Sequence, residues 1–104
     1  QWKGENLMLD LVGKKYYHIS LNIERYPLKK YLKINTFMEE SINYIKYMPN
    51  CYIMYTDISI DKIYRNIKSI LDEGEHVFIC ELNLANRQGW LPKSVWNWIR
   101  ENYA

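Results

Sequence analysis

Two cysteines and two histidines are the residues of this sequence best suited to metal binding or nucleophilic catalysis: Cys51, Cys80, His18 and His76. A metal site needs three or four such ligands in the right spacing, and the sequence has no C-x-x-C or H-x-x-x-H pair, which argues against structural zinc. His76 and Cys80 share one face of a predicted strand but would stand about 13 Å apart, too far to form a Cys–His pair. Cys80 could pair with His18 only if their strands are neighbours. We therefore expect no metal, no cofactor and no catalytic residue, and we interpret both cysteines as reduced, buried small hydrophobes.

Basic side chains gather between residues 11 and 34, where the only acid is Glu24. The candidate phosphate contacts in this segment are Lys14, Lys15, Arg25, Lys29, Lys30 and Lys33. Tyr26 and Tyr31 lie among them and could stack on bases. The alternative interpretation is a solvated loop and helix face.

Length and composition narrow the class of protein. The chain has 104 residues, 48% of them hydrophobic and 25% charged, which is typical of one globular domain. No run of about 18 apolar residues could cross a membrane, and the first residues are too polar for a secretory signal, so we expect a cytoplasmic protein without a membrane partner. No P-loop, G-x-G-x-x-G or G-x-S-x-G motif is present. The net charge of +2 is too small to indicate nucleic-acid binding by itself.

Three segments have clear periodicity. Residues 15–23 (KYYHISLNI) alternate, which predicts a strand with Tyr17, Ile19, Leu21 and Ile23 on its buried face. Residues 59–73 predict a helix capped by Ser59 and stopped by a glycine at position 74. Residues 76–82 (HVFICEL) predict a further strand.

Two segments are ambiguous. Thr36 and Glu39 have the capping-box spacing for a helix that begins near residue 36, although this helix could begin near Leu28. The stretch after it could continue as helix to Tyr47, or form a hairpin of strands 44–48 and 51–56 with a turn at Pro49. We favour the hairpin.

The resulting order of elements predicts an α+β fold with the ferredoxin-like βαββαβ plan: an antiparallel sheet with helices on one face. A Trp-rich helix with Pro92 near its start follows the last strand, and we expect it to close the core or a dimer contact. Residues 15–104 would form this single domain, and residues 1–14 an N-terminal arm or an edge strand.

Four stretches follow one another in the order typical of a known protein family: YHISLNI, CYIMYTDISIDKIYRNI, EGEHVFICELN and GWLPKSVWNWI. They resemble the SinR-like members of a ferredoxin-fold superfamily that includes the second CRISPR adaptation protein and the VapD-type ribonucleases. The likeness covers residues 15–102 and rests on the order and spacing of the motifs. It implies a ferredoxin-like homodimer, with bacterial or phage defence as the expected setting.

One position departs from the family pattern. In nuclease-type members an Asp at the end of the first strand, one from each subunit, helps to hold a divalent metal. The matching residue here is Asn22, whose neutral amide cannot supply the negative charge that hard cations favour. Glu24, on the same strand face, could substitute for it, but we expect Asn22 to cap the strand end and metal-assisted hydrolysis to be weak or absent.

Three functional hypotheses follow. The first is a non-catalytic homodimer that acts as a nucleic-acid-associated scaffold or adaptor through the basic segment. The second is a protein-binding module of phage defence or counter-defence, because ten Tyr and four Trp in so small a domain leave aromatic rings for an interface. The third is a metal-dependent nuclease of the family type.

Overall fold

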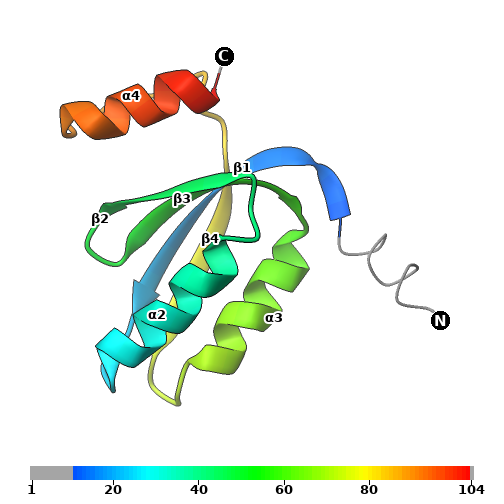
Figure 1. Cartoon of the computed structure of the whole chain (residues 1–104), viewed down its shortest axis with the longest axis vertical. Coiled ribbons are helices and arrows are strands. Elements are labelled where there is room, and N and C mark those ends of the chain that lie inside the picture. Colours follow the sequence, from blue (N-terminus) through cyan, green and yellow to red (C-terminus); the bar gives the residue numbers. More distant parts are fainter. Residues whose placement is uncertain (1–10, 104) are drawn as a thin grey trace.

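Residues 11–103, the part of the chain that the computed structural model describes, form four strands and three helices (Figure 1). In chain order they are β1 (Leu11–Asn22), α2 (Pro27–Met38), β2 (Asn43–Met48), β3 (Cys51–Ile58), α3 (Ile60–Ile70), β4 (His76–Leu82) and α4 (Lys93–Asn102). The α+β class expected from the sequence is confirmed. β1 includes residues 11–14, and the rest of the predicted N-terminal arm lies outside the described residues.

The four strands form one antiparallel sheet in the order β2-β3-β1-β4, with β2 and β4 at its edges. This arrangement is consistent with the ferredoxin-like plan. The pairing of β1 with both β3 and β4 places residues 16–20 at the centre of the sheet.

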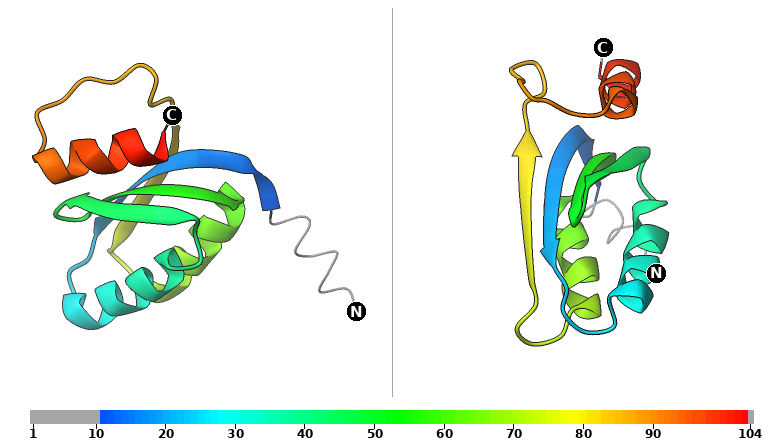
Figure 2. Two further views of the ribbon diagram at one scale, coloured as in Figure 1. Left: turned by 45° about the horizontal axis from the view of Figure 1, so that its top comes forward. Right: turned by 90° about the vertical axis from the view of Figure 1, so that its left-hand side faces the viewer.

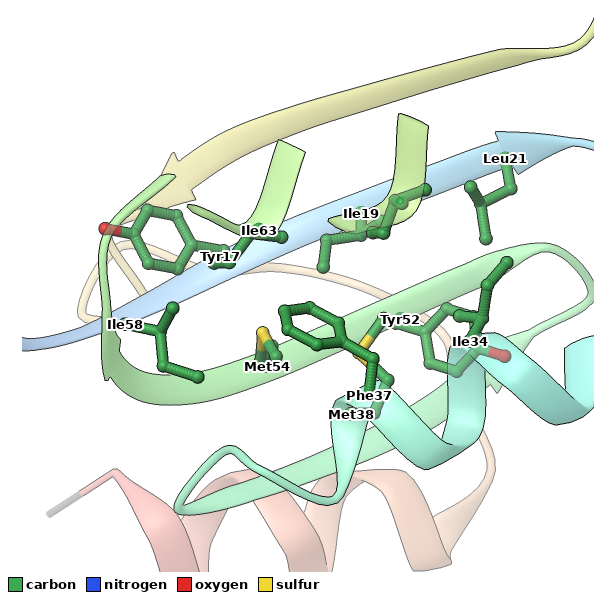
Figure 3. Close-up of a cluster of buried hydrophobic side chains, with 11 residues drawn as sticks. Tyr17, Ile19, Leu21, Ile34, Phe37, Met38, Tyr52, Met54, Ile58 and Ile63 are labelled. Atoms are coloured by element: carbon green, nitrogen blue, oxygen red, sulfur yellow. The ribbon is translucent and has the colours of Figure 1, made fainter. Parts of the chain in front are cut away.

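The predicted alternation of β1 is confirmed. Tyr17, Ile19 and Leu21 are buried on the face of the sheet that α2 and α3 cover (Figure 3). They belong to a core cluster whose helical members include Ile34 and Ile63. Burial of these side chains holds both helices against one face of the sheet, and each buried aliphatic side chain contributes about 1.5–3 kcal/mol.

The β2–β3 hairpin is also confirmed. Its two-residue connection is Pro49-Asn50, and Asn50 has a φ of 65°, a left-handed conformation that asparagine tolerates well. The carbonyl of Asn50 accepts a hydrogen bond of 2.9 Å from the backbone N–H of Leu21, which fixes the turn beside the end of β1.

The first helix begins nine residues before the capping-box position. Pro27 occupies its first turn and Glu39 is its C-cap, so residue 36 lies near its end rather than its start. The Thr36 hydroxyl donates to the carbonyl of Leu32 in the preceding turn, at 2.9 Å, instead of capping a new helix. The prediction of a helix beginning near residue 36 is therefore wrong, and the alternative start near Leu28 is close to the observed one.

The second predicted helix has the expected cap. The hydroxyl of Ser59 accepts a hydrogen bond from the backbone N–H of Lys62, at 3.2 Å. The helix ends at Ile70, a little before the predicted end, and Gly74 lies in the following turn with a φ of +88°. That conformation favours glycine, so the sequence signal marks the turn into β4 rather than the last helical residue.

The Trp-rich helix α4 lies on the other side of the β2–β3 hairpin from α2 and α3 (Figures 1 and 2). Tyr16, which alternates with the core-facing residues of β1, donates a hydrogen bond to the carbonyl of Asn102 and packs edge-on against Tyr103. Val95 and Ile99 are buried outside the main core cluster. The helix therefore closes a second, smaller apolar layer, whereas Trp90 in the connection is 99% exposed.

No helix among residues 11–103 combines the length and apolar character that a membrane crossing requires.

Candidate functional site

Lys30 is not a candidate phosphate contact in the folded protein. Only 6% of this residue is exposed, and its Nζ donates to Asp72 at 2.6 Å and to Glu75 at 2.7 Å. Both acceptors lie in the turn between α3 and β4. A buried ammonium held by two carboxylates has no donor directed at an external phosphate, so we correct its assignment from a binding residue to a structural one.

The carboxylate of Glu75 connects three segments of the chain. Its Oε2 accepts the backbone N–H groups of Glu24 and Arg25 at 2.7 and 2.8 Å, and its Oε1 accepts Lys30 Nζ and the backbone N–H of Asp72. The backbone N–H of Arg25, together with the Lys30 ammonium, lowers the pKa of Glu75 to about 2. This clamp fixes the connection between β1 and α2.

The remaining basic residues fall into two groups. Lys14 and Lys15 lie on β1, and Lys15 pairs with Glu81 of β4 at 3.5 Å. At the usual strand rise, Lys15 and the end of β1 at Asn22 are about 23 Å apart. Arg25, Lys29 and Lys33 follow that end of β1 and are exposed. The basic segment therefore does not form a single continuous track.

The outer side of α2 carries exposed apolar and basic residues together. Leu28 and Leu32 are 76% and 60% exposed, and Tyr26, just before the helix, is 74% exposed. Lys29 and Lys33 are also exposed. Residues four apart lie on the same side of a helix, so the two leucines form one row and the two lysines form the row beside it. We call these five residues the α2 surface.

The backbone of the α2 surface is strained at one point. Tyr26 has a φ of 51° and ψ of 53°, the left-handed conformation, directly before Pro27. Non-glycine residues adopt this conformation at a cost of about 1–2 kcal/mol. Strain of this kind persists where the surrounding structure imposes it, and it is concentrated at functional sites. The strained residue is the N-cap of α2, two positions before the exposed Leu28.

Tyr31 is not available for base stacking. Lys46 of β2 lies over its ring, 4.1 Å from the centroid, and its hydroxyl donates to the side chain of Asn50. Burial raises the pKa of the Tyr31 hydroxyl. The predicted stacking role is therefore wrong for Tyr31, because both its ring face and its hydroxyl are used within the fold.

Asn22, the residue expected from the resemblance to match a metal-binding Asp, is exposed at the end of β1. The side-chain amide of Asn22 lies 3.5 Å from Glu24, and in the sheet register Asn22 is opposite His76. Within residues 11–103 there is no group of three His, Cys, Asp or Glu side chains arranged to hold a metal ion. The two alternative residues for that one metal ligand, Asn22 and Glu24, are therefore in contact with each other.

His18 and Cys80 are cross-strand neighbours in the β1–β4 register. The strands are thus adjacent, as a Cys–His pair requires, but the two side chains have other partners. His18 Nε2 lies 2.7 Å from the hydroxyl of Tyr47, and the Cys80 thiol donates to the carbonyl of Glu81. Both cysteines are free thiols, yet Cys80 is exposed and Cys51 half-buried, which corrects their interpretation as buried hydrophobes.

Comparison of the chain with protein-family models, curated proteins and solved structures finds no match. The candidate site is therefore defined by geometry alone. Sequence reasoning identified Lys29 and Lys33 but missed Leu28 and Leu32, which precede the helix start that the capping box indicated. Helical spacing from Pro27 was the signal that could have placed both leucines on the outer side of α2.

Proposed function

We propose that this chain is a non-catalytic adaptor domain with a ferredoxin-like fold, and that it binds a protein partner through the α2 surface. The observation that carries the proposal is the exposure of Leu28 and Leu32 on one row of α2. Apolar side chains that form a contiguous exposed row, with an aromatic residue beside them, are typical of protein interfaces.

The charges of the α2 surface indicate the chemistry of the partner. Lys29 and Lys33 flank the apolar row, and Arg25 is exposed just before it. A partner segment with apolar anchors and acidic flanking residues would bury the leucines and place carboxylates beside the lysines. Such charges contribute orientation and association rate more than affinity.

The test compares retention of copurified protein by the parent chain and by variants, after nuclease treatment and at high salt. We expect the Leu28→Ser, Leu32→Ser double variant to lose the partner, since the apolar anchors are removed. Ile42→Ser is the matched control, because Ile42 is an exposed apolar residue outside α2. Equal retention by the double variant and the parent would contradict the proposal.

Nucleic-acid binding is the second candidate function, supported by the exposure of Arg25, Lys29 and Lys33 at one end of the domain. Fluorescence anisotropy with labelled RNA and DNA, in magnesium and at two salt concentrations, tests it, and a gel of the recovered probe reports cleavage. Salt-sensitive binding that Lys29→Ala, Lys33→Ala weakens, with a shallower salt dependence, would support it. Undiminished affinity in that variant would exclude the α2 lysines as phosphate contacts.

We also propose that the adaptor is a homodimer, for which the β4 edge is the best-supported surface. No strand among the described residues pairs with the outer edge of β4, and Phe78 on this strand is 63% exposed. Ile60, Asp61 and Tyr64 of α3 line a hollow beside it. Two antiparallel copies of one edge strand are self-complementary about a two-fold axis. Light scattering of the parent, Phe78→Lys and the control Ile42→Lys tests this assembly, and a monomeric parent would contradict it.

A further inference from the structure

A cavity of about 310 Å³ lies between the sheet and α4, on the opposite face from the core cluster. Ile53 and Leu82 line it from the sheet, and Trp96 and Ile99 line it from α4. The connection between β4 and α4 closes one side, with Leu84 and Leu91 facing the cavity. A volume near 300 Å³ is at the small end of the range for ligand sites, so its occupant would be a small molecule.

The polar groups of this cavity are few. His18 lines it with its Nε2 bonded to Tyr47, and burial lowers the pKa of the imidazole, which therefore stays neutral near pH 7. Among residues 11–103, Arg87 is the one permanently charged side chain that lines the cavity, and none of the carboxylates in this range lines it. The cavity is therefore electrostatically suited to an anion and unsuited to a cation.

The contacts of Arg87 within the fold use only some of its N–H donors. Its Nη1 donates to the carbonyl of Leu84 at 2.9 Å, and its guanidinium lies 5.8 Å from the ring centroid of Tyr103. The first contact holds the side chain against the connection. A guanidinium has five N–H donors, so others remain for a bound carboxylate.

We propose that this cavity binds a small aromatic monoanion, with its ring against Trp96 and Ile53 and its carboxylate on the guanidinium of Arg87. The apolar lining supplies the affinity for the ring. The Arg87 guanidinium, with no carboxylate beside it in the lining that the described residues form, supplies the selectivity for a negatively charged substituent. This site is separate from the α2 surface and does not depend on the function proposed for it.

The test uses 2-naphthoate as the probe and the neutral 2-naphthamide as its matched analogue. Binding is followed in proton–nitrogen correlation spectra through the indole N–H signal of Trp96, assigned with Trp96→Phe. We expect a saturable shift with naphthoate. Naphthamide should bind about tenfold more weakly, the magnitude expected for loss of one charge-assisted hydrogen bond at a partly exposed site.

Three variants test which residues are responsible for binding of the probes. Arg87→Gln should weaken naphthoate about tenfold and leave naphthamide unchanged, by the same hydrogen-bond estimate. Arg100→Gln is the control, because Arg100 is an exposed cation of α4 that does not line the cavity. Gly89→Leu should block both probes, since a Cβ at Gly89 would lie 3.6 Å from the Trp96 ring without backbone strain.

Several outcomes would overturn the proposal. One is the absence of a saturable Trp96 shift at millimolar naphthoate in the folded parent. Another is equal affinity for the two probes, or an equal loss of naphthoate affinity in Arg87→Gln and Arg100→Gln. A Trp96 signal that moves with protein concentration and is insensitive to naphthoate would assign the cavity to a second copy of the chain instead.

Discussion

Lys30 Nζ lies 2.7 Å from Oε1 of Glu75, and only 8% and 1% of the two side chains are exposed. The pair joins α2 to the turn before β4, while the other oxygen of Glu75 binds the backbone before α2. Lys30, one of the lysines of the basic segment, is thus part of the structure that positions the α2 surface. Its neighbours Lys29 and Lys33 remain exposed, in the row of basic residues beside Leu28 and Leu32.

The Glu75 clamp predicts a specific acid sensitivity. The folded-state pKa of Glu75 is about 2, below the ordinary value of 4.5, so its contribution to stability is present above pH 4.5 and is lost as pH falls towards 2. Glu75→Gln should lower the Tm at neutral pH and flatten the pH dependence of Tm in this window. Thermal unfolding between pH 2 and 7, with Glu73→Gln as the exposed control, measures it. An unchanged pH dependence in Glu75→Gln would contradict the clamp.

Substitution of the neighbouring residues Lys30 and Lys29 should change the stability of the protein by different amounts. Lys30→Met removes the cation of a buried pair and leaves two carboxylates without it, so the Tm should fall clearly. Lys29→Met removes an exposed charge and should change the free energy of unfolding by no more than about 0.5 kcal/mol. Denaturant unfolding of both variants checks the contrast. Equal stability of the two variants would contradict the structural role of Lys30.

His18 should titrate below its ordinary value of 6.5, because burial disfavours the imidazolium. A histidine with a lowered folded-state pKa contributes no destabilisation above pH 6.5, and stability is lost as pH falls below that value towards the folded pKa. Proton–carbon spectra of the His18 imidazole across pH 4–8 give the pKa. A value of 6.5 or higher for His18 would contradict burial as the control of its ionisation.

The core cluster predicts a contrast within α3. Ile63 is fully buried, so Ile63→Ala should cost about 2–5 kcal/mol of unfolding free energy through lost burial and the cavity left behind. Ile60 is 40% exposed one turn earlier, and Ile60→Ala should cost far less. Urea unfolding of both variants measures the difference. Similar costs at the two positions would contradict the orientation of α3.

The strain at Tyr26 predicts opposite effects on stability and binding. Glycine adopts a positive φ without penalty, so Tyr26→Gly should raise the free energy of unfolding by about 1 kcal/mol. The same change removes an exposed ring from the α2 surface and should weaken partner retention. Denaturant unfolding and the copurification assay, run on the same variant, check both effects. A less stable variant would show that the Tyr26 side chain makes contacts that outweigh the strain.

Local sequence patterns correctly predicted the elements for which the hydrophobic periodicity agrees with the turn or capping residues. The alternation of β1, the turn at Pro49-Asn50 and the Ser59 cap all arise within a few residues, and each is found at the expected place. The start of α2 was ambiguous because Thr36 and Glu39 imitate a capping box, whereas Pro27 provides the true start. Local patterns of this kind cannot separate a cap from a hydroxyl that bonds to the preceding turn.

Which basic residues of the segment pair within the fold depends on contacts between residues that are far apart in the sequence. The acceptors of Lys30 lie 42 and 45 residues away, and the partner of Lys15 is on a different strand. Neither spacing nor charge patterning within residues 11–34 contains this information. The candidate cavity is also non-local, since Ile53 and Trp96 approach one another only after the sheet and α4 have assembled.

Because α4 packs apart from the main core, it and the main core differ in the free energy needed to open them. Its buried residues Val95 and Ile99 lie outside the cluster that holds α2 and α3 to the sheet, and residues 83–92 connect it to β4 without helix or strand. Opening of α4 would therefore leave the main core intact and require less free energy than global unfolding. Amide protons of α4 should accordingly exchange with solvent through sub-global opening, and those of β1 and β3 only when the whole domain unfolds.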